Sequence, residues 1–127
     1  MKSFLLLIFD ELNVRGYRQG TIIDEIEPNE FYTYWNMSNK DEYSNNVPLI
    51  FKNTYQVCFY CKEENLINDK NYLEIGMNKF IEKARSYGLV VNNVQDFASG
   101  LDGYISMMCR VEYAQHDNPL NVSLAVE

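Results

Sequence analysis

The chain has 127 residues, a length that fits one domain with a sizeable core, and its 46% of hydrophobic residues, with 14% aromatic, argues against a disordered protein. It has 11 Lys and Arg residues against 18 Asp and Glu, and the net charge of −7 opposes tight binding to nucleic-acid phosphates. This charge does not exclude DNA that passes nearby without binding.

The first element predicted is an amphipathic helix over residues 3–14, with Ser3 as a suitable N-cap and Gly16 ending the helix. Its apolar side chains recur at helical spacing: Phe4, Leu5, Ile8, Phe9 and Leu12. Leu6 and Leu7 widen this stripe, so we expect the helix to lie deep in the fold or to meet a second chain. Because acidic residues follow the short apolar run directly, we expect a helix here and not a signal peptide, and a cytosolic product.

Next, the sequence predicts a short strand over residues 20–27 and an aromatic strand over residues 30–36. Side chains of the second strand alternate between two faces, and both faces carry aromatic rings. Phe31, Thr33 and Trp35 share one face, and Tyr32 and Tyr34 share the other. The polar run over residues 37–47 that follows is expected to be a loop.

Residues 49–62 alternate again and predict a long strand. A helix over residues 69–87 comes next, ended by Gly88, and two strands over residues 89–96 and 104–114 complete the pattern. The apolar stripe of the helix contains Leu73, Met77, Phe80, Ala84 and Tyr87, with Ile81 alongside.

These elements do not alternate regularly between strand and helix, which predicts the α+β class rather than a parallel sheet. We expect a mostly antiparallel sheet with two main helices packed on one face. Residues 1–115 are expected to form a single domain, and residues 116–127 a flexible C-terminal tail.

No pattern in the sequence predicts catalysis, a cofactor or a metal. Cys58 and Cys61 have the spacing of half a zinc site, which Cys109 and His116 would complete, but residues three apart on a strand point to opposite faces. His116 is the only histidine and has no nucleophile motif near it, and the glycines form no phosphate-binding loop. We therefore expect a protein that is not an enzyme.

The aromatic strand could also serve as a platform on which the bases of single-stranded nucleic acid stack. Lys and Arg do not surround this strand, and the chain is acidic. Core packing or contact with another subunit is the better interpretation, since Tyr and Trp are enriched at protein interfaces.

Four segments together resemble the tail-terminator or tail-completion proteins of long-tailed, non-contractile bacteriophages: FYTYWN, the polar run after it, NTYQVCFYCKEE and KFIEKARSYGLVV. The similarity covers about residues 30–113 and departs from the family pattern at 93–103. The matching positions are Phe31, Tyr34, Trp35, Asn36, Asp41, Tyr43, Asn45, Val57, Phe59, Tyr60, Phe80, Ile81, Ala84, Gly88 and Leu89.

The resemblance implies a structural role at the head–tail junction of a virion, for a protein made in the cytoplasm of the host bacterium. Such proteins form a ring, typically a hexamer, that ends growth of the tail tube and joins the tail to the head connector. The expected partners are further copies of this chain, the tail-tube protein and the head connector or stopper protein, with no membrane and no sequence-specific nucleic acid.

The residues expected to contact these partners lie on the aromatic strand and in the polar run: Tyr32, Tyr34, Trp35, Asp41, Tyr43 and Asn45. A different class of function stays open at this point. The chain also suits a small, non-catalytic ligand-binding or regulatory α+β module that acts as a monomer or dimer.

Overall fold

The computed structural model describes residues 2–20, 28–44 and 47–116, with side chains described for 2–20, 28–37 and 54–112. Three helices and five strands follow one another along these segments. They are α1 (Lys2–Leu12), β1 (Gly16–Arg18), β2 (Glu30–Ser44), β3 (Val47–Lys62), α2 (Asn65–Asn68), α3 (Tyr72–Ser86), β4 (Val90–Phe97) and β5 (Tyr104–His116).

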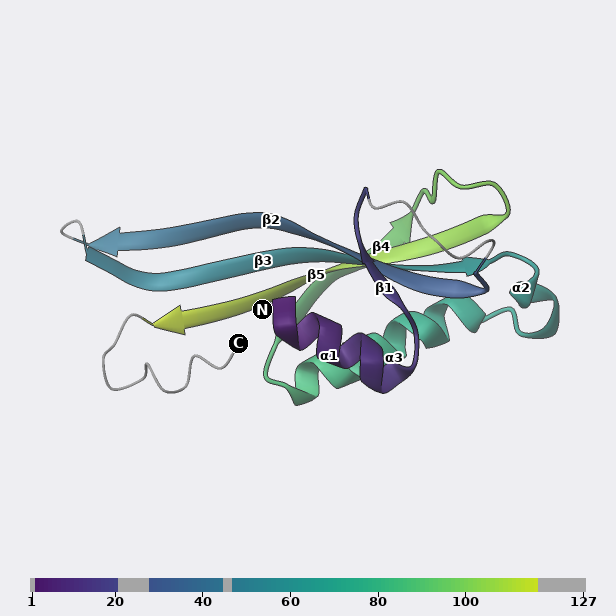
Figure 1. The fold of residues 1–127 in the computed structure, drawn as a ribbon, viewed down its shortest axis with the longest axis horizontal. Coiled ribbons are helices and arrows are strands. Elements are labelled where there is room, and N and C mark those ends of the chain that lie inside the picture. Colours follow the sequence, from purple (N-terminus) through teal and green to yellow (C-terminus); the bar gives the residue numbers. More distant parts are fainter. Residues whose placement is uncertain (1, 21–27, 45–46, 117–127) are drawn as a thin grey trace.

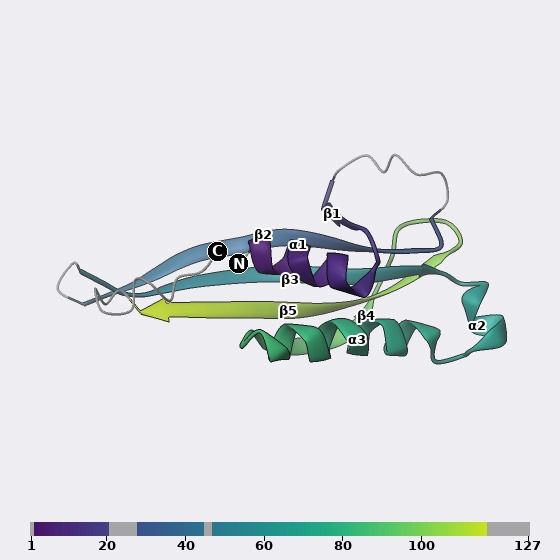
Figure 2. The same ribbon diagram turned by 60° about the horizontal axis from the view of Figure 1, so that its bottom comes forward.

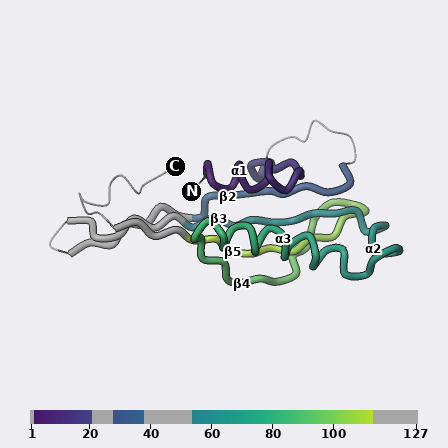
Figure 3. The backbone as a smooth tube through the Cα atoms, turned by 90° about the horizontal axis from the view of Figure 1, so that it is seen from below, coloured from purple at the N-terminus to yellow at the C-terminus, as the bar shows by residue number. Residues whose placement is uncertain are grey.

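The strands form one sheet in the order β1-β2-β3-β5-β4. Only the short β1 runs parallel to its neighbour, and the other three pairings are antiparallel. The two long helices, α1 and α3, pack on the same face of the sheet (Figure 1, Figure 2). Seen from the helix side, α1 lies along β2 while α3 lies over β3 and β5 (Figure 3). The predicted α+β class with two main helices on one face is confirmed.

The main core fills the space between the sheet and these two helices. The predicted stripe of α3 is buried there, with Tyr87 partly buried at its end. Phe9 of α1 stacks on Tyr32 of β2 at 4.9 Å between ring centroids and lies 5.8 Å from Phe80 of α3. Each fully buried side chain of this size stabilises the fold by about 1.5–3 kcal/mol, so the stripe is what holds α3 on the sheet.

A second cluster of buried side chains lies on the opposite face of the sheet. Its members are Tyr17, Phe31, Cys58, Tyr60 and Met108. Phe31 stacks on Tyr60 across the β2–β3 pair, with 4.8 Å between the ring centroids. The predicted alternation of β2, with aromatic rings on both faces, is therefore confirmed, and Phe31, Tyr32 and Tyr34 all pack against other rings of the chain.

Helix α3 ends in a Schellman motif. The Gly88 amide donates to the carbonyl of Arg85, the Leu89 amide donates to the carbonyl of Ala84, and Gly88 adopts φ 82°. This left-handed conformation suits glycine, so the expected end of the helix at Gly88 is confirmed.

Helix α1 ends earlier than the sequence predicts, at Leu12, with Asn13 in the left-handed region at φ 63°. Gly16 belongs to β1 instead, and its role is steric. A Cβ atom at this position would lie 2.1 Å from the Phe9 ring, so only glycine lets β1 pass beneath that ring. The helix-ending role predicted for Gly16 was therefore wrong.

The largest departure from prediction is the polar run over residues 37–47, which was expected to be a loop. Strand β2 continues through it to Ser44, and β3 begins at Val47. The paired backbone register continues out to Ser44 and Val47, with irregularities between Asn36 and Ser38 and again near Tyr43. Hydrogen bonds to β3 compensate for the low strand propensity of this run.

Two further predictions fall partly outside the described residues. Of the strand expected over residues 20–27, the structure describes only Gly20, which is in a turn. His116 ends β5, while the rest of the expected tail, residues 117–127, is not described.

Candidate functional site

The predicted contact residues do not form one surface. Tyr32 is 1% exposed and lies in the main core, where its hydroxyl donates a 3.0 Å hydrogen bond to the carbonyl of Gly76. Burial is the main cause that raises the pKa of Tyr32 far above its ordinary value. The proposed contact role of Tyr32 needs correction, because its side chain supports α3 and is closed to a partner.

Tyr34 also points to the helix face and is mostly buried. Trp35 points to the opposite face and is 47% exposed, so it is the predicted contact residue whose ring is open to a partner. Asp41 and Tyr43 lie within β2, where the structure describes their backbone, and Asn45 lies outside the described residues.

Strands β2 and β3 continue well past the two long helices, as Figure 1 and Figure 2 show. We call this projecting part, residues 35–44 of β2 with residues 47–56 of β3, the arm. Strand β5 runs beside β3 along the arm as far as the pair Ile50 and His116. The sequence analysis missed the arm because its signal is pairing between strands and not local periodicity.

The arm has an open edge. Strand β1 pairs with β2 only at Tyr32, Thr33 and Tyr34, so in the described chain the outer edge of β2 has no partner strand from Trp35 to Ser44. At the other side of the sheet, β4 pairs only with β5 and leaves its own outer edge open within the same segments. Backbone amide and carbonyl groups on such edges are ready to pair with another chain.

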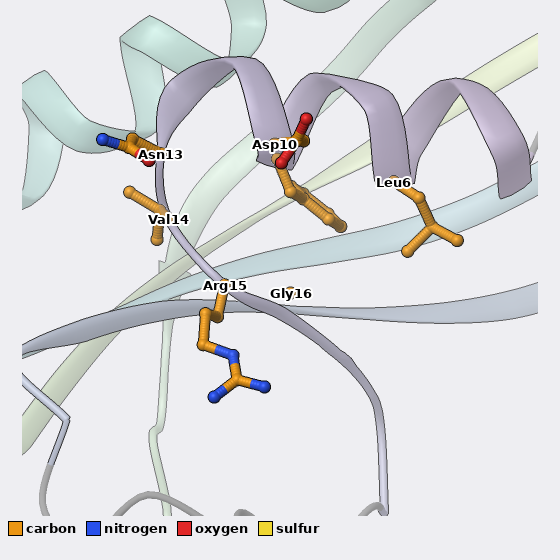
Figure 4. A pocket seen from close by; sticks show the side chains of 7 residues that line it. Leu6, Asp10, Asn13, Val14, Arg15 and Gly16 are labelled. Atoms are coloured by element: carbon orange, nitrogen blue, oxygen red, sulfur yellow. The ribbon is translucent and has the colours of Figure 1, made fainter.

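A groove of about 280 Å³ lies between α1 and the beginning of β1 (Figure 4). Leu6 and Asp10 come from α1, while the side chain of Arg15 extends away from the helix. The guanidinium of Arg15 lies 5.6 Å from the centre of the Tyr17 ring. The groove combines apolar and oppositely charged side chains.

The three cysteines are buried free thiols. Cys58 lies in the second cluster and Cys61 in the main core, so the prediction that their side chains point to opposite faces is confirmed. Burial is the main cause that raises the pKa of Cys61 to about 11 and that of Cys109 to about 12. Within the described residues, no group of three or more His, Cys, Asp or Glu side chains is placed to hold a metal ion.

A polar network also ties the beginning of α3 to the sheet. The hydroxyl of Tyr72 donates to the carboxylate of Glu30, and Asn29 donates to the same hydroxyl at 3.2 Å. Burial, together with the Glu30 carboxylate, raises the pKa of Tyr72 to about 12. The arrangement keeps a neutral tyrosine bonded to a carboxylate, which links α3 to β2.

No helix in the described part of the chain has the length and apolar character needed to cross a bilayer.

Neither a protein-family model nor a curated protein matches this sequence. Solved structures do match. One of them, a protein whose name states no function, has a TM-score of 0.52 over 94% of this chain and 98% of its own length, with 9% sequence identity. At that identity the similarity concerns the fold alone, and it extends across nearly the whole of both chains.

Proposed function

We propose that this chain is a structural virion protein of the bacteriophage tail-terminator or tail-completion type. Copies of it associate into a closed ring, typically a hexamer, at the head–tail junction. The ring ends growth of the tail tube and binds the head connector or stopper protein. Its mechanism is binding between complementary surfaces, without chemical turnover. The sequence resemblance over about residues 30–113 supports this choice among partner-binding proteins.

The observation that carries the proposal is the open edge of β2 between Trp35 and Ser44. An edge of this length is unusual in a free subunit, because its unpaired backbone groups invite pairing with other chains. Lys40, Asp41 and Glu42 lie on this edge strand, and charged residues there restrict pairing to suitable partners.

The two open edges of the sheet also suit assembly into a ring. A closed ring requires each subunit to offer two different surfaces, one to each neighbour. The β2 edge and the β4 edge are different surfaces on opposite sides of one sheet. Contacts at two such edges let a subunit bind a neighbour on each side.

The first test is the mass of the purified protein under native conditions, followed by negative-stain imaging. We expect a multiple of the 14.9 kDa subunit and ring-shaped particles. Trp35→Ser should shift the mass toward the single subunit, since an exposed Trp at an interface contributes strongly to binding. Ile67→Ser is the matched control, because Ile67 is 84% exposed on α2, away from the arm.

Both variants should keep the far-ultraviolet circular dichroism spectrum of the unaltered protein, because both side chains are exposed. A single-subunit or dimer mass for the unaltered protein would contradict the ring. That outcome would favour the alternative, a small ligand-binding or regulatory module.

The functional test is a phage that lacks this gene. We expect tails of uncontrolled length, or complete heads and tails that fail to join. Normal tails joined to heads in that mutant would exclude the proposed role.

A further inference from the structure

A second, smaller pocket of about 180 Å³ lies at the base of the arm. Side chains from α1, β1, β2 and β3 line it: Lys2, Arg18, Tyr34, Trp35, Asn36 and Tyr55. Among the described residues that line the pocket there is no Asp or Glu, although the chain as a whole carries a net charge of −7. The described lining therefore combines two positive charges with several hydrogen-bond donors.

Two tyrosine hydroxyls line this pocket. Tyr34 and Tyr55 are each 8% exposed, and neither hydroxyl makes a hydrogen bond within the described structure. Their rings pack against each other with 6.5 Å between centroids, which holds both side chains against the pocket wall. Neither hydroxyl is a buried, unpaired atom, so both are open to an acceptor that enters the pocket.

Two cations also line the pocket. Neither Lys2 nor Arg18 forms an ion pair with any described residue. Arg18 acts electrostatically on Tyr55: burial and the neighbouring Tyr34 raise the pKa of the Tyr55 hydroxyl, while the Arg18 charge opposes them. This hydroxyl is protonated near neutral pH, where it can donate a hydrogen bond.

We propose that this pocket binds an oxyanion, either a carboxylate or a phosphate group. The Arg18 guanidinium offers paired donors that match the oxygen atoms of such a group, and Lys2 adds a compact positive charge. The hydroxyls of Tyr34 and Tyr55 supply further donors. Hydrogen bonds that involve a charged group are about twice as strong as neutral ones.

The two sources of such an anion are distinguishable by titration of the full chain. Inorganic phosphate represents a free anion, and a short peptide of glutamates represents a carboxylate of a protein. Isothermal calorimetry and two-dimensional amide NMR spectra follow both titrations. We expect saturable binding with shifted signals at Arg18, Tyr34 and Tyr55.

Two variants test the assigned donors. Tyr55→Phe removes a hydroxyl and keeps the ring, and Arg18→Gln removes the charge and keeps a polar side chain. Each should weaken binding at least about tenfold, because a lost hydrogen bond to a charged group costs roughly 1.5–3 kcal/mol. The matched control is Arg15→Gln, since Arg15 lies just before the same strand and faces the α1–β1 groove.

Stronger binding of phosphate would identify a free anion as the source, and stronger binding of the peptide would identify a protein carboxylate. Both results support the pocket. Absence of saturable binding of either probe would overturn the inference. It would also be overturned if Arg15→Gln weakened anion binding as much as Arg18→Gln does. The test is independent of the ring, since it measures anion binding whatever the mass of the protein.

Discussion

The hydroxyl of Tyr32 donates a hydrogen bond to the backbone carbonyl of Gly76, joining β2 to the middle of α3. This bond requires the helix backbone to approach the sheet closely. The Phe59 ring lies directly beneath the same glycine, where an added Cβ atom would be 2.2 Å from the ring. Gly76 thus sets the distance between α3 and the sheet.

We predict that Gly76→Ala destabilises the protein although alanine is the better helix former. The gain in helix propensity is about 1 kcal/mol, while overpacking against a buried ring costs typically about 1–3 kcal/mol. Urea unfolding followed by circular dichroism measures the net change. Asn78→Ala, at an exposed position of the same helix, is the control and should be neutral or slightly stabilising. A Gly76→Ala protein as stable as that control would contradict the close contact.

Phe80→Ala is expected to be among the most destabilising single changes in the chain. The Phe80 ring is fully buried between α3 and the sheet, beside the rings of Phe9 and Tyr32. Its removal leaves a cavity and should lower the free energy of unfolding by about 3–5 kcal/mol. Glu82→Ala, on the exposed side of α3, is the matched control. A loss below about 1 kcal/mol would mean that this ring is not part of a packed core.

The three thiols should react slowly with iodoacetamide in the folded protein at pH 8. Burial holds the pKa of Cys61 at about 11, so only about one molecule in a thousand carries the reactive thiolate there at pH 8. The pKa of Cys109, at about 12, makes its thiolate rarer still. Reaction should accelerate as the pH rises, and all three thiols should react together in urea. Mass spectrometry of the alkylated protein follows each step, and rapid labelling of Cys61 without unfolding would contradict its burial.

From the open edge of β2 we predict two different rates of amide hydrogen exchange along the strand. Along an antiparallel strand, successive amide groups alternate between facing the partner strand and facing away from it. In the isolated subunit, amides of residues 35–44 that face β3 should exchange slowly, and those on the outer edge should exchange fast. Assembly should slow the second set. Slow exchange of both sets in a confirmed single subunit would show that the edge is covered within the chain.

Local patterns in the sequence determined which side of each element is buried. The two-residue alternation of β3 and the stripe of α3 predicted the core faces correctly, because apolar spacing directly reflects which side chains leave water. Likewise, Gly88 marked the end of α3, since a left-handed residue is needed there and glycine provides it without strain.

Only the tertiary structure decided the arm, the position of β1 and the role of Tyr32. The polar run after Asn36 has low strand propensity, and it is extended because β3 lies alongside it and accepts and donates its backbone hydrogen bonds. A residue's neighbours across a sheet are distant in sequence, so local spacing contains no information about them. For the same reason Lys2, Arg18 and Tyr55, from three separate elements, meet in one pocket that no motif in the sequence indicates.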